Sequence, residues 1–214
     1  REVMMFLQSH GISTNFAVKI YKIYGEQTIP ILKENPYRMA QDMVGIGFKT
    51  ADKIARSMGI ELDSPYRVMA GTKYVLSQAA NNGHTYLPKE ELINSAAALL
   101  GVDTQLVENA IVSLAMNQSI TIEETEEHTA VYLQPFYVAE SNISKALIEL
   151  AMTDMPIPVD NLDELIYDLQ KQEKIILAQN QKEAVIESLK NGVLVITGGP
   201  GTGKTTTVNC IIKL

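Results

Sequence analysis

One run of eight residues has the types and spacing of a phosphate-binding loop. Residues 198–205 read Gly-Gly-Pro-Gly-Thr-Gly-Lys-Thr and match G-x-x-x-x-G-K-[ST] at every fixed position. Glycines let successive backbone N–H groups curl around phosphate oxygens, and the lysine brings a compact positive charge to the β- and γ-phosphates. The residues predicted to bind ATP are Gly198, Gly199, Pro200, Gly201, Thr202, Gly203, Lys204, Thr205 and Thr206. Lys204 and Thr205 are predicted to be catalytic, with the Thr205 hydroxyl as a ligand of Mg²⁺.

The flanking residues agree with this loop. Residues 193–197 form a continuous apolar run typical of a buried parallel strand, and a helix is expected from Gly203 to the chain end. Hydrolysis also needs an acid that positions Mg²⁺ and water, normally on a later strand, and only ten residues follow Lys204. Because the chain also begins with Arg1, we expect a catalytically incomplete piece of a longer protein.

A second glycine motif lies near the start of the chain. Gly45-Ile46-Gly47 precedes an amphipathic helix on which Lys49, Lys53 and Arg56 recur at i, i+4 and i+7. Such a turn presents free N–H groups to a backbone phosphate, with no base specificity. A related copy, Gly11-Ile12-Ser13, begins 34 residues earlier. The predicted DNA-binding residues are Gly11, Gly45, Gly47, Lys49, Thr50, Lys53 and Arg56; the alternative is a plain helical turn with solvated lysines.

Charge is unevenly distributed along the chain. The whole chain carries −7, but residues 1–61 carry +2 and residues 62–214 carry −9. Residues 101–170 contain thirteen acidic side chains and one basic one, Lys145. A uniformly basic protein that coats nucleic acid is therefore excluded, and a polyanion is expected to meet the first third of the chain.

The positions of glycine and proline along the chain predict where its helices and strands begin and end. Helices are expected at 3–10, 15–24, 29–33, 38–43 and 49–58, and again at 64–80, 88–100 and 103–116. Alternating residues predict strands at 119–123 and 129–133. Three helices followed by a hairpin are the outline of a winged-helix domain, although a helical bundle with an added hairpin fits the pattern too. Helices at 136–152, 161–172 and 179–189, with a linker at 155–158, complete the expectation.

Other classes of site and location find little support in the sequence. Cys210 is the single cysteine, which excludes a disulfide within the chain and favours a reducing compartment. The three histidines lie in dissimilar contexts without ligand spacing, so a histidine metal site is not expected. No apolar run approaches the roughly 18 residues of a membrane span. We expect a cytoplasmic protein without a membrane partner.

Two stretches resemble a known family. Residues 194–207 are similar to the nucleotide-binding loop of RecD-type helicases of superfamily 1, and Leu177, Gln181, Ala184 and Val185 fit that superfamily's Q motif, L-x-x-x-Q-x-x-A-V. The resemblance implies that Gln181 contacts the adenine edge. The second glycine turn resembles the helix-hairpin-helix motif L-P-G-I-G-x-x-T-A, with Val44 where proline is common, and the first copy departs with Ser13.

Together these features resemble the long, stand-alone RecD-like helicases of bacteria. The implied fold is mainly α: a tandem helix-hairpin-helix region at 1–62, a winged-helix-like α+β domain at 63–134, and the truncated start of a RecA-like α/β P-loop domain at 135–214. The implied function is ATP-dependent 5′–3′ unwinding of single-stranded or junction DNA in repair or recombination, with ATP and Mg²⁺. Two alternatives stay open: a non-motor DNA-binding adaptor with a nucleotide-responsive loop, and a small-molecule phosphotransferase with a helical interaction module.

Overall fold

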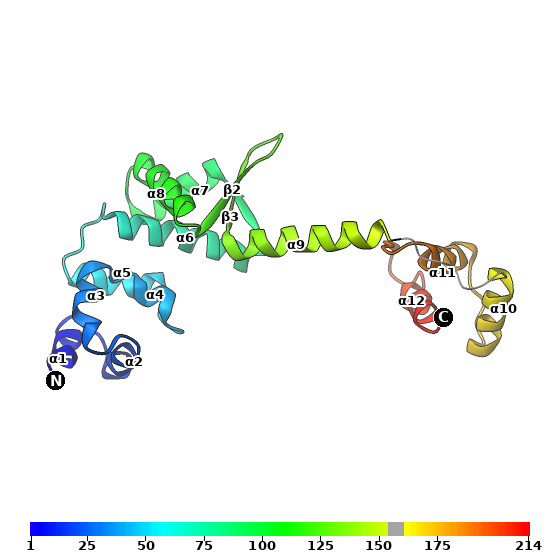
Figure 1. Ribbon diagram of the computed structural model, residues 1–214, viewed down its shortest axis with the longest axis horizontal. Coiled ribbons are helices and arrows are strands. Elements are labelled where there is room, and N and C mark those ends of the chain that lie inside the picture. Colours follow the sequence, from blue (N-terminus) through cyan, green and yellow to red (C-terminus); the bar gives the residue numbers. More distant parts are fainter. Residues whose placement is uncertain (154–160) are drawn as a thin grey trace. The chain divides into compact units, whose positions relative to one another are not determined.

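The computed structural model describes residues 1–153 and 161–214, so the predicted linker at 155–158 lies outside the described residues. The chain forms two compact units, Arg1–Val138 and Ala139–Leu214 (Figure 1). The predicted mainly α class is confirmed, since the only strands found in the described residues are three short ones. The finer domain limits at residues 62 and 134 stay predictions.

The first unit begins with two helical hairpins. Glu2–Ser9 (α1) and Thr14–Tyr24 (α2) flank the first glycine turn, and Arg38–Asp42 (α4) and Phe48–Ser57 (α5) flank the second. A short turn at Gly25–Gln27 (η1) and Thr28–Glu34 (α3) connect the hairpins. Each turn starts with a glycine in the left-handed region, Gly11 at φ +75° and Gly45 at φ +94°, where a side chain is strained. These glycines therefore fix the reversal of the chain between the helices.

The rest of the first unit has the topology of a winged helix. Pro65–Asn81 (α6), Tyr86–Pro88 (β1), Lys89–Leu100 (α7), Thr104–Met116 (α8), Ile120–Glu124 (β2) and Thr129–Leu133 (β3) follow in order. The strands form one antiparallel sheet in the order β1-β3-β2, with Ile122 opposite Val131 and Leu87 also opposite Val131. The tip of the β2–β3 hairpin projects away from the helices, as in a wing (Figure 1). The winged-helix outline therefore fits the structure better than a helical bundle with an added hairpin.

Local sequence explains the limits of these helices. Pro65 occupies the first turn of α6, where its missing N–H costs nothing. Gly101 ends α7 in the left-handed conformation, and the Asp103 carboxylate then accepts a hydrogen bond from the Gln105 N–H at 2.8 Å to cap α8. Residues buried between the helices and the sheet join those of the hairpins in one continuous core, from Leu7 to Val131. The two regions of the first unit are thus packed as one body.

The second unit is built from helices around a small core. Gln134–Ala151 (α9) crosses the boundary between the units, and Leu162–Glu173 (α10), Gln179–Lys190 (α11) and Lys204–Ile212 (α12) follow. Ile166, Leu169, Leu177, Val185 and Cys210 form the buried cluster. Burial raises the pKa of the Cys210 thiol, which keeps it protonated. The phosphate loop lies between the end of α11 and the start of α12.

Two expectations about strands differ from the structure. Residues 193–197 lead directly into the phosphate loop but are not a strand, because no segment in the described part of the chain pairs with them. A strand is defined by hydrogen bonds to a neighbour, which an apolar run does not supply by itself. Conversely, β1 was not predicted. Its three residues include a proline and are too few to show an alternating pattern.

Candidate nucleotide-binding site and DNA interface

The phosphate loop owes its backbone shape to glycine. Gly201 and Gly203 have φ values of +77° and +80°, and Gly203 directly precedes α12 as its N-cap. A Cβ atom at Gly203 would lie 2.4 Å from Nε2 of Gln181, so this position also needs the space. Gly199 has no positive φ, and a Cβ atom there would meet no heavy atom of the described residues within 4 Å. The fold of the described residues therefore does not by itself require glycine at position 199.

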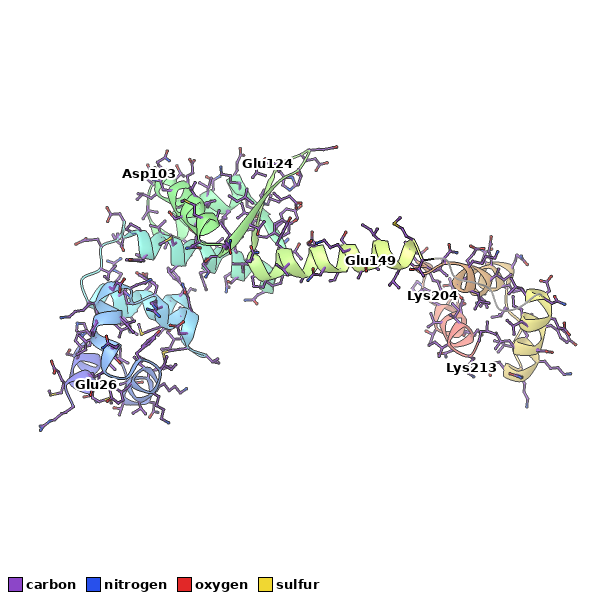
Figure 2. The ribbon with its side chains drawn as sticks, in the orientation of Figure 1. Glu26, Asp103, Glu124, Glu149, Lys204 and Lys213 are labelled. Carbon is purple, nitrogen blue, oxygen red and sulfur yellow. The ribbon has the colours of Figure 1, made fainter. Side chains whose placement is uncertain are left out.

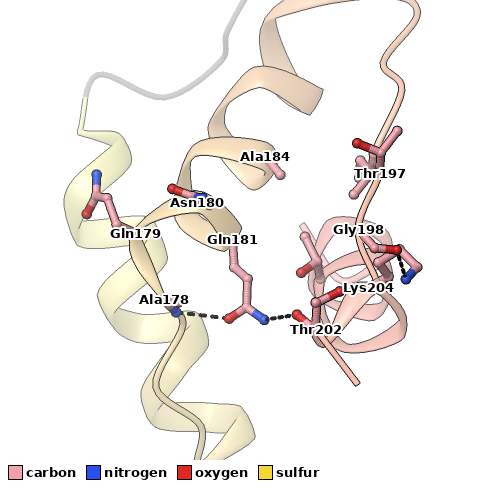
Figure 3. Close-up of a pocket in the computed structure, with 11 residues that line it drawn as sticks. Ala178, Gln179, Asn180, Gln181, Ala184, Thr197, Gly198, Thr202 and Lys204 are labelled. Carbon is pink, nitrogen blue, oxygen red and sulfur yellow. Dashed lines mark hydrogen bonds between the residues drawn. The ribbon is translucent and has the colours of Figure 1, made fainter. Parts of the chain in front are cut away.

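Lys204 lies across this loop. Its Nζ donates a hydrogen bond to the carbonyl oxygen of Gly198 at 2.6 Å (Figure 3). It donates a second one to the carbonyl oxygen of Gly199 at 2.7 Å. The Thr202 hydroxyl donates to the same Gly199 carbonyl at 2.9 Å. The ammonium group is thus held where the loop curls, at the position from which it can meet phosphate oxygens. Charge-assisted hydrogen bonds to phosphate are stronger than those to neutral carbonyls, so an anion would displace these two contacts.

Gln181 joins α11 to the loop. Its side-chain oxygen accepts a hydrogen bond from the Ala178 N–H at 2.9 Å, and its Nε2 donates to the Thr202 carbonyl at 3.1 Å (Figure 3). The first contact caps the N-terminus of α11, and the second reaches a residue 21 positions along the chain. The structure therefore places this glutamine at the loop. Its role at the adenine edge stays a prediction.

A cavity of about 480 Å³ lies between α11 and the loop. One side is lined by the first turns of α11 and the other by the loop, as Figure 3 shows; the lining residues are Ala178, Gln179, Asn180, Gln181, Ala184, Ile196, Thr197, Gly198, Thr202, Lys204 and Thr207. The volume is within the roughly 300–1,000 Å³ of small-ligand sites. No acidic side chain of the described residues lines it, so these residues can hold phosphates but cannot position a water molecule through a carboxylate.

Thr205 and Thr206 lie on the first turn of α12. Both side chains are exposed, and neither lines the cavity. Within residues 1–153 and 161–214 no group of three His, Cys, Asp or Glu side chains could hold a metal ion. The role of the Thr205 hydroxyl as a ligand of Mg²⁺ stays a prediction.

The two helical hairpins repeat with a spacing of 34 residues in structure as well as in sequence. Ile12 and Ile46 are both buried, and Ala17 and Ala51 are fully buried where the helices approach. Ser13 and Gly47 are both N-caps in the extended region, and neither helix has a side-chain cap. The N–H groups of each first turn are therefore left to solvent or a ligand.

The second hairpin carries its positive charges on exposed positions of α5. Lys49, Lys53 and Arg56 are exposed, as is Thr50, and none of the three basic residues is in an ion pair with a described residue. Val44, just before the turn, is 97% exposed. Gly47 has φ −89°, and a Cβ atom there would meet no described heavy atom within 4 Å, so the fold does not require glycine. The role of Gly47 as a DNA contact stays a prediction.

Sequence reasoning missed the residues that anchor this hairpin. Nε and Nη2 of buried Arg67, on α6, donate to the two Asp52 carboxylate oxygens at 2.9 and 3.3 Å, and Nη1 donates to the carbonyls of Leu62 and Leu100 at 2.8 and 2.9 Å. The Tyr37 hydroxyl donates to Asp52 at 2.7 Å. Burial, together with this hydrogen bond, raises the pKa of Tyr37. An arginine in an otherwise apolar stretch of α6 was the one available signal.

The winged-helix region has a surface of the opposite character. Its third helix, α8, has no basic residue, and Asp103 at its start and Glu124 in the hairpin both point outward (Figure 2). A helix that docks in the major groove is normally accompanied by basic side chains that contact the flanking phosphates, and α8 supplies none. The acidic charge predicted for this part of the chain is thus presented on its surface.

Comparison with known proteins finds matches that include the helical hairpins and the phosphate loop. Residues 1–86 match the family described as the ATP-dependent RecD2 DNA helicase HHH domain, and residues 181–214 match an AAA domain. The whole chain is 26% identical, over 224 aligned residues, to the ATP-dependent RecD2 DNA helicase of Deinococcus radiodurans. The chain is RecD-like.

This RecD-like chain spans less than a third of the length of the two relatives named here. It spans 31% of the Deinococcus protein. A second relative, the RecBCD enzyme subunit RecD of Buchnera aphidicola, is 29% identical over 154 residues, which cover 64% of this chain and 25% of that protein. The first match includes all the hairpin residues discussed above, and the AAA match begins at Gln181 and includes the whole phosphate loop.

No single helix in the ranges that the structure describes is long and apolar enough to cross a membrane. Helices α7 and α8 meet the length and composition criteria only together, as a pair bent by 116°.

Proposed function

We propose that this RecD-like chain is the DNA-gripping and nucleotide-binding part of an ATP-dependent DNA helicase. The observation that carries the proposal is the presence of a phosphate-loop motif and a helical hairpin with exposed basic residues in a chain that is similar to a RecD2 helicase along its whole length. Lys204 and its loop would bind the phosphates of ATP, and the second hairpin would bind the DNA backbone. Unwinding in the 5′–3′ direction, a role in repair or recombination and a cytoplasmic location belong to the same proposal and are supported by the family likeness.

In the ATP site, each residue has a role that follows from its position. The loop N–H groups would surround the β- and γ-phosphates, with Lys204 turning from the Gly198 and Gly199 carbonyls to the phosphate oxygens. Thr205 would provide a hydroxyl to Mg²⁺, which when bound neutralises charge that develops on the phosphates. Gln181 would reach the adenine from the first turn of α11. Because no acid of the described residues lines the cavity, this chain by itself would bind ATP without hydrolysing it.

In the proposed contact, the DNA backbone would lie along the exposed surface of α5, the α5 platform, rather than in an enclosed groove. The N–H groups after Gly47 would meet one phosphate, and Lys49, Lys53 and Arg56 would meet neighbouring phosphates of the same strand. Contacts of this kind hold any sequence, as an enzyme that moves along DNA requires. The acidic surface of α8 and the β2–β3 hairpin would keep those elements away from the polyanion.

ATP binding tests the nucleotide half of the proposal. Lys204→Ala in the 214-residue chain should weaken binding of a fluorescent ATP analogue by at least about 100-fold, because it removes the only cation among the described residues that line the cavity. Fluorescence titration with Mg²⁺ present measures the dissociation constant. Lys171→Ala, at an exposed position on α10 in the same unit, is the matched control and should bind normally. Equal affinity in the Lys204 and Lys171 variants would refute the assignment.

A further inference from the structure

A second cavity lies beside the DNA-binding hairpin and has no part in the ATP site. It measures about 450 Å³ and is formed by α4 with the residue before it, the start of α5 and the middle of α6. Its lining includes Tyr37, Gly47, Phe48, Lys73, Tyr74 and Ser77. The cavity is large enough for a small ligand. All of these residues belong to the first compact unit.

Aromatic rings form one wall of this cavity. Phe48 lies between Tyr37 and Tyr74, with ring centroids 6.0 Å and 5.2 Å apart and interplanar angles of 20° and 27°. Phe48 is buried and the Tyr37 hydroxyl is bound to Asp52, so these two rings are fixed. Tyr74 is only partly buried. The stack therefore ends in a ring beside open space, on which another flat ring could stack.

Lys73 contributes an unpaired charge to the same cavity. It is half-buried, and no carboxylate of the described residues lies within ion-pair distance of its ammonium group. Burial lowers the pKa of Lys73, which is the expected cost of placing a cation in a partly apolar site. The neighbouring polar side chains are Ser77 and the amides of Gln41 and Gln78, all uncharged. An anionic group that entered the cavity would therefore find a cation with no competing partner among the described residues.

The position of the cavity connects it to DNA. Gly47, the N-cap of α5, and Phe48, its first residue, line the cavity, and Lys49 follows directly on the exposed surface. A strand whose phosphates lie along α5 thus passes next to the opening. A flat aromatic wall with a cation and amides at its edge is the chemistry that recognises a nucleotide: a base stacks and a phosphate pairs with the ammonium.

We propose that this cavity receives one unpaired nucleotide of the DNA strand held by the second hairpin. The base stacks on Tyr74, and Lys73 donates a hydrogen bond to the nucleotide's phosphate. The proposal rests on the DNA-binding function proposed for α5 and adds to it a preference for DNA that offers an unstacked base. A fully paired duplex would use only the α5 platform, since its bases are not available to the cavity.

The test compares a duplex carrying one bulged 2-aminopurine with the same duplex fully paired. The 214-residue chain should bind the bulged duplex about tenfold more tightly, the order expected for one base–aromatic stack, and should quench the 2-aminopurine fluorescence. Lys73→Met keeps the apolar stem and Tyr74→Leu keeps bulk without the ring. Each should abolish the preference and leave paired-duplex affinity unchanged. Lys33→Met, at an exposed position of α3, is the matched control and should behave as the unmodified chain.

The outcomes distinguish a failure of this proposal from a failure of the DNA-binding function proposed for α5. If Lys73→Met and Tyr74→Leu both keep the preference while their circular dichroism and Tm match the unmodified chain, the cavity is only a gap covered by the lysine stem, and the proposal is overturned. If the chain binds no duplex, the proposal that α5 binds DNA has failed. Deoxyadenosine monophosphate then tests binding to the cavity directly. In a Lys204→Ala background, saturation-transfer NMR should show its base in contact with the protein and lose that signal on Lys73→Met; no signal in either variant also overturns the proposal.

Discussion

The two helical hairpins share the backbone pattern of their turns but have different surroundings. Position by position, 34 residues apart, both have a left-handed glycine, a buried isoleucine and an extended N-cap. Lys19 and Lys22 on α2 correspond to Lys53 and Arg56 on α5, and all four are exposed. However, Asn15 corresponds to Lys49, and Ser13 corresponds to Gly47. The second copy therefore has one more cation, and its N-cap residue has no side chain.

Their attachment to the rest of the unit differs as well. Asp52 of the second copy is bound to Arg67 and Tyr37, whereas the corresponding residue of the first copy is Val18, which is 43% exposed. The first copy is instead tied to its neighbour, because the Tyr24 hydroxyl donates to Asp42 on α4 at 2.8 Å. A repeated backbone therefore does not mean a repeated function. The second copy is the one that is fixed to the winged-helix region through Arg67, and it is the one for which we propose DNA binding.

Removing the anchor of the second hairpin should have the largest effect. Asp52→Ala leaves the buried Arg67 guanidinium without its carboxylate, which should lower the free energy of unfolding by about 3 kcal/mol, the low end of the range for a broken buried pair, because two carbonyl contacts remain. Urea unfolding measures the change. Val18→Ala, the corresponding change in the first copy, should cost well under about 1 kcal/mol. Similar losses in the two variants would mean that the hairpins are not differently anchored.

Charge reversal should separate the two hairpins in DNA binding. The variant Lys49→Glu, Lys53→Glu, Arg56→Glu should lower affinity for duplex DNA about tenfold or more at low salt. It should also reduce the slope of log affinity against log salt by about two to three, since each phosphate contact contributes roughly 0.9. Fluorescence anisotropy at several salt concentrations provides both values.

The first copy supplies the comparison for that experiment. Lys19→Glu, Lys22→Glu should have a smaller effect, with a change of slope below about two, because this turn has two cations and a serine N-cap. An equal or larger effect would reverse the assignment of the second hairpin as the main grip. An unchanged affinity in both variants would favour plain helical turns with solvated lysines.

Exchanging the N-caps should give the smallest effect. Gly47→Ser should leave stability unchanged or raise it by a few tenths of a kcal/mol, since Ser is a favoured N-cap and space for it exists. It should nevertheless weaken DNA binding a few-fold by keeping the backbone away from a phosphate. Ser13→Gly in the first copy should change binding in the opposite direction, or not at all. Thermal unfolding and anisotropy would show whether stability and affinity separate in this way.

Local structure could be predicted well where glycine and proline mark the chain. The helices of the hairpins were placed to within one or two residues, because Gly11, Gly25, Gly45 and Gly59 end or begin helices by their own conformational freedom. The predictions failed where structure depends on a distant partner. Residues 193–197 have the composition of a strand but no described neighbour to pair with, and β1 exists because β3 lies beside it.

The candidate sites also differ in how far the sequence alone could predict them. The phosphate loop could be read from spacing alone, since its glycines and lysine are adjacent in the chain. Gln181 could be reached only through the family resemblance, and its contact with Thr202 became visible only in the structure. Asp52, Arg67 and Tyr37, and the cavity with Lys73 and Tyr74, bring together residues from three helices and a turn. The sequence pattern of one segment does not indicate which residues of other segments it will contact.

The burial of Cys210 makes the chain convenient for site-specific labelling. It is the chain's single cysteine, only 2% exposed, and its thiol is kept protonated by burial, so maleimide reagents should react slowly with it. A cysteine introduced at an exposed position such as Val44 would carry a dye almost alone. A second one at Ile176, 93% exposed in the other unit, would complete a donor–acceptor pair. Single-molecule energy transfer could then follow the two units as ATP and DNA bind, without first removing any native residue.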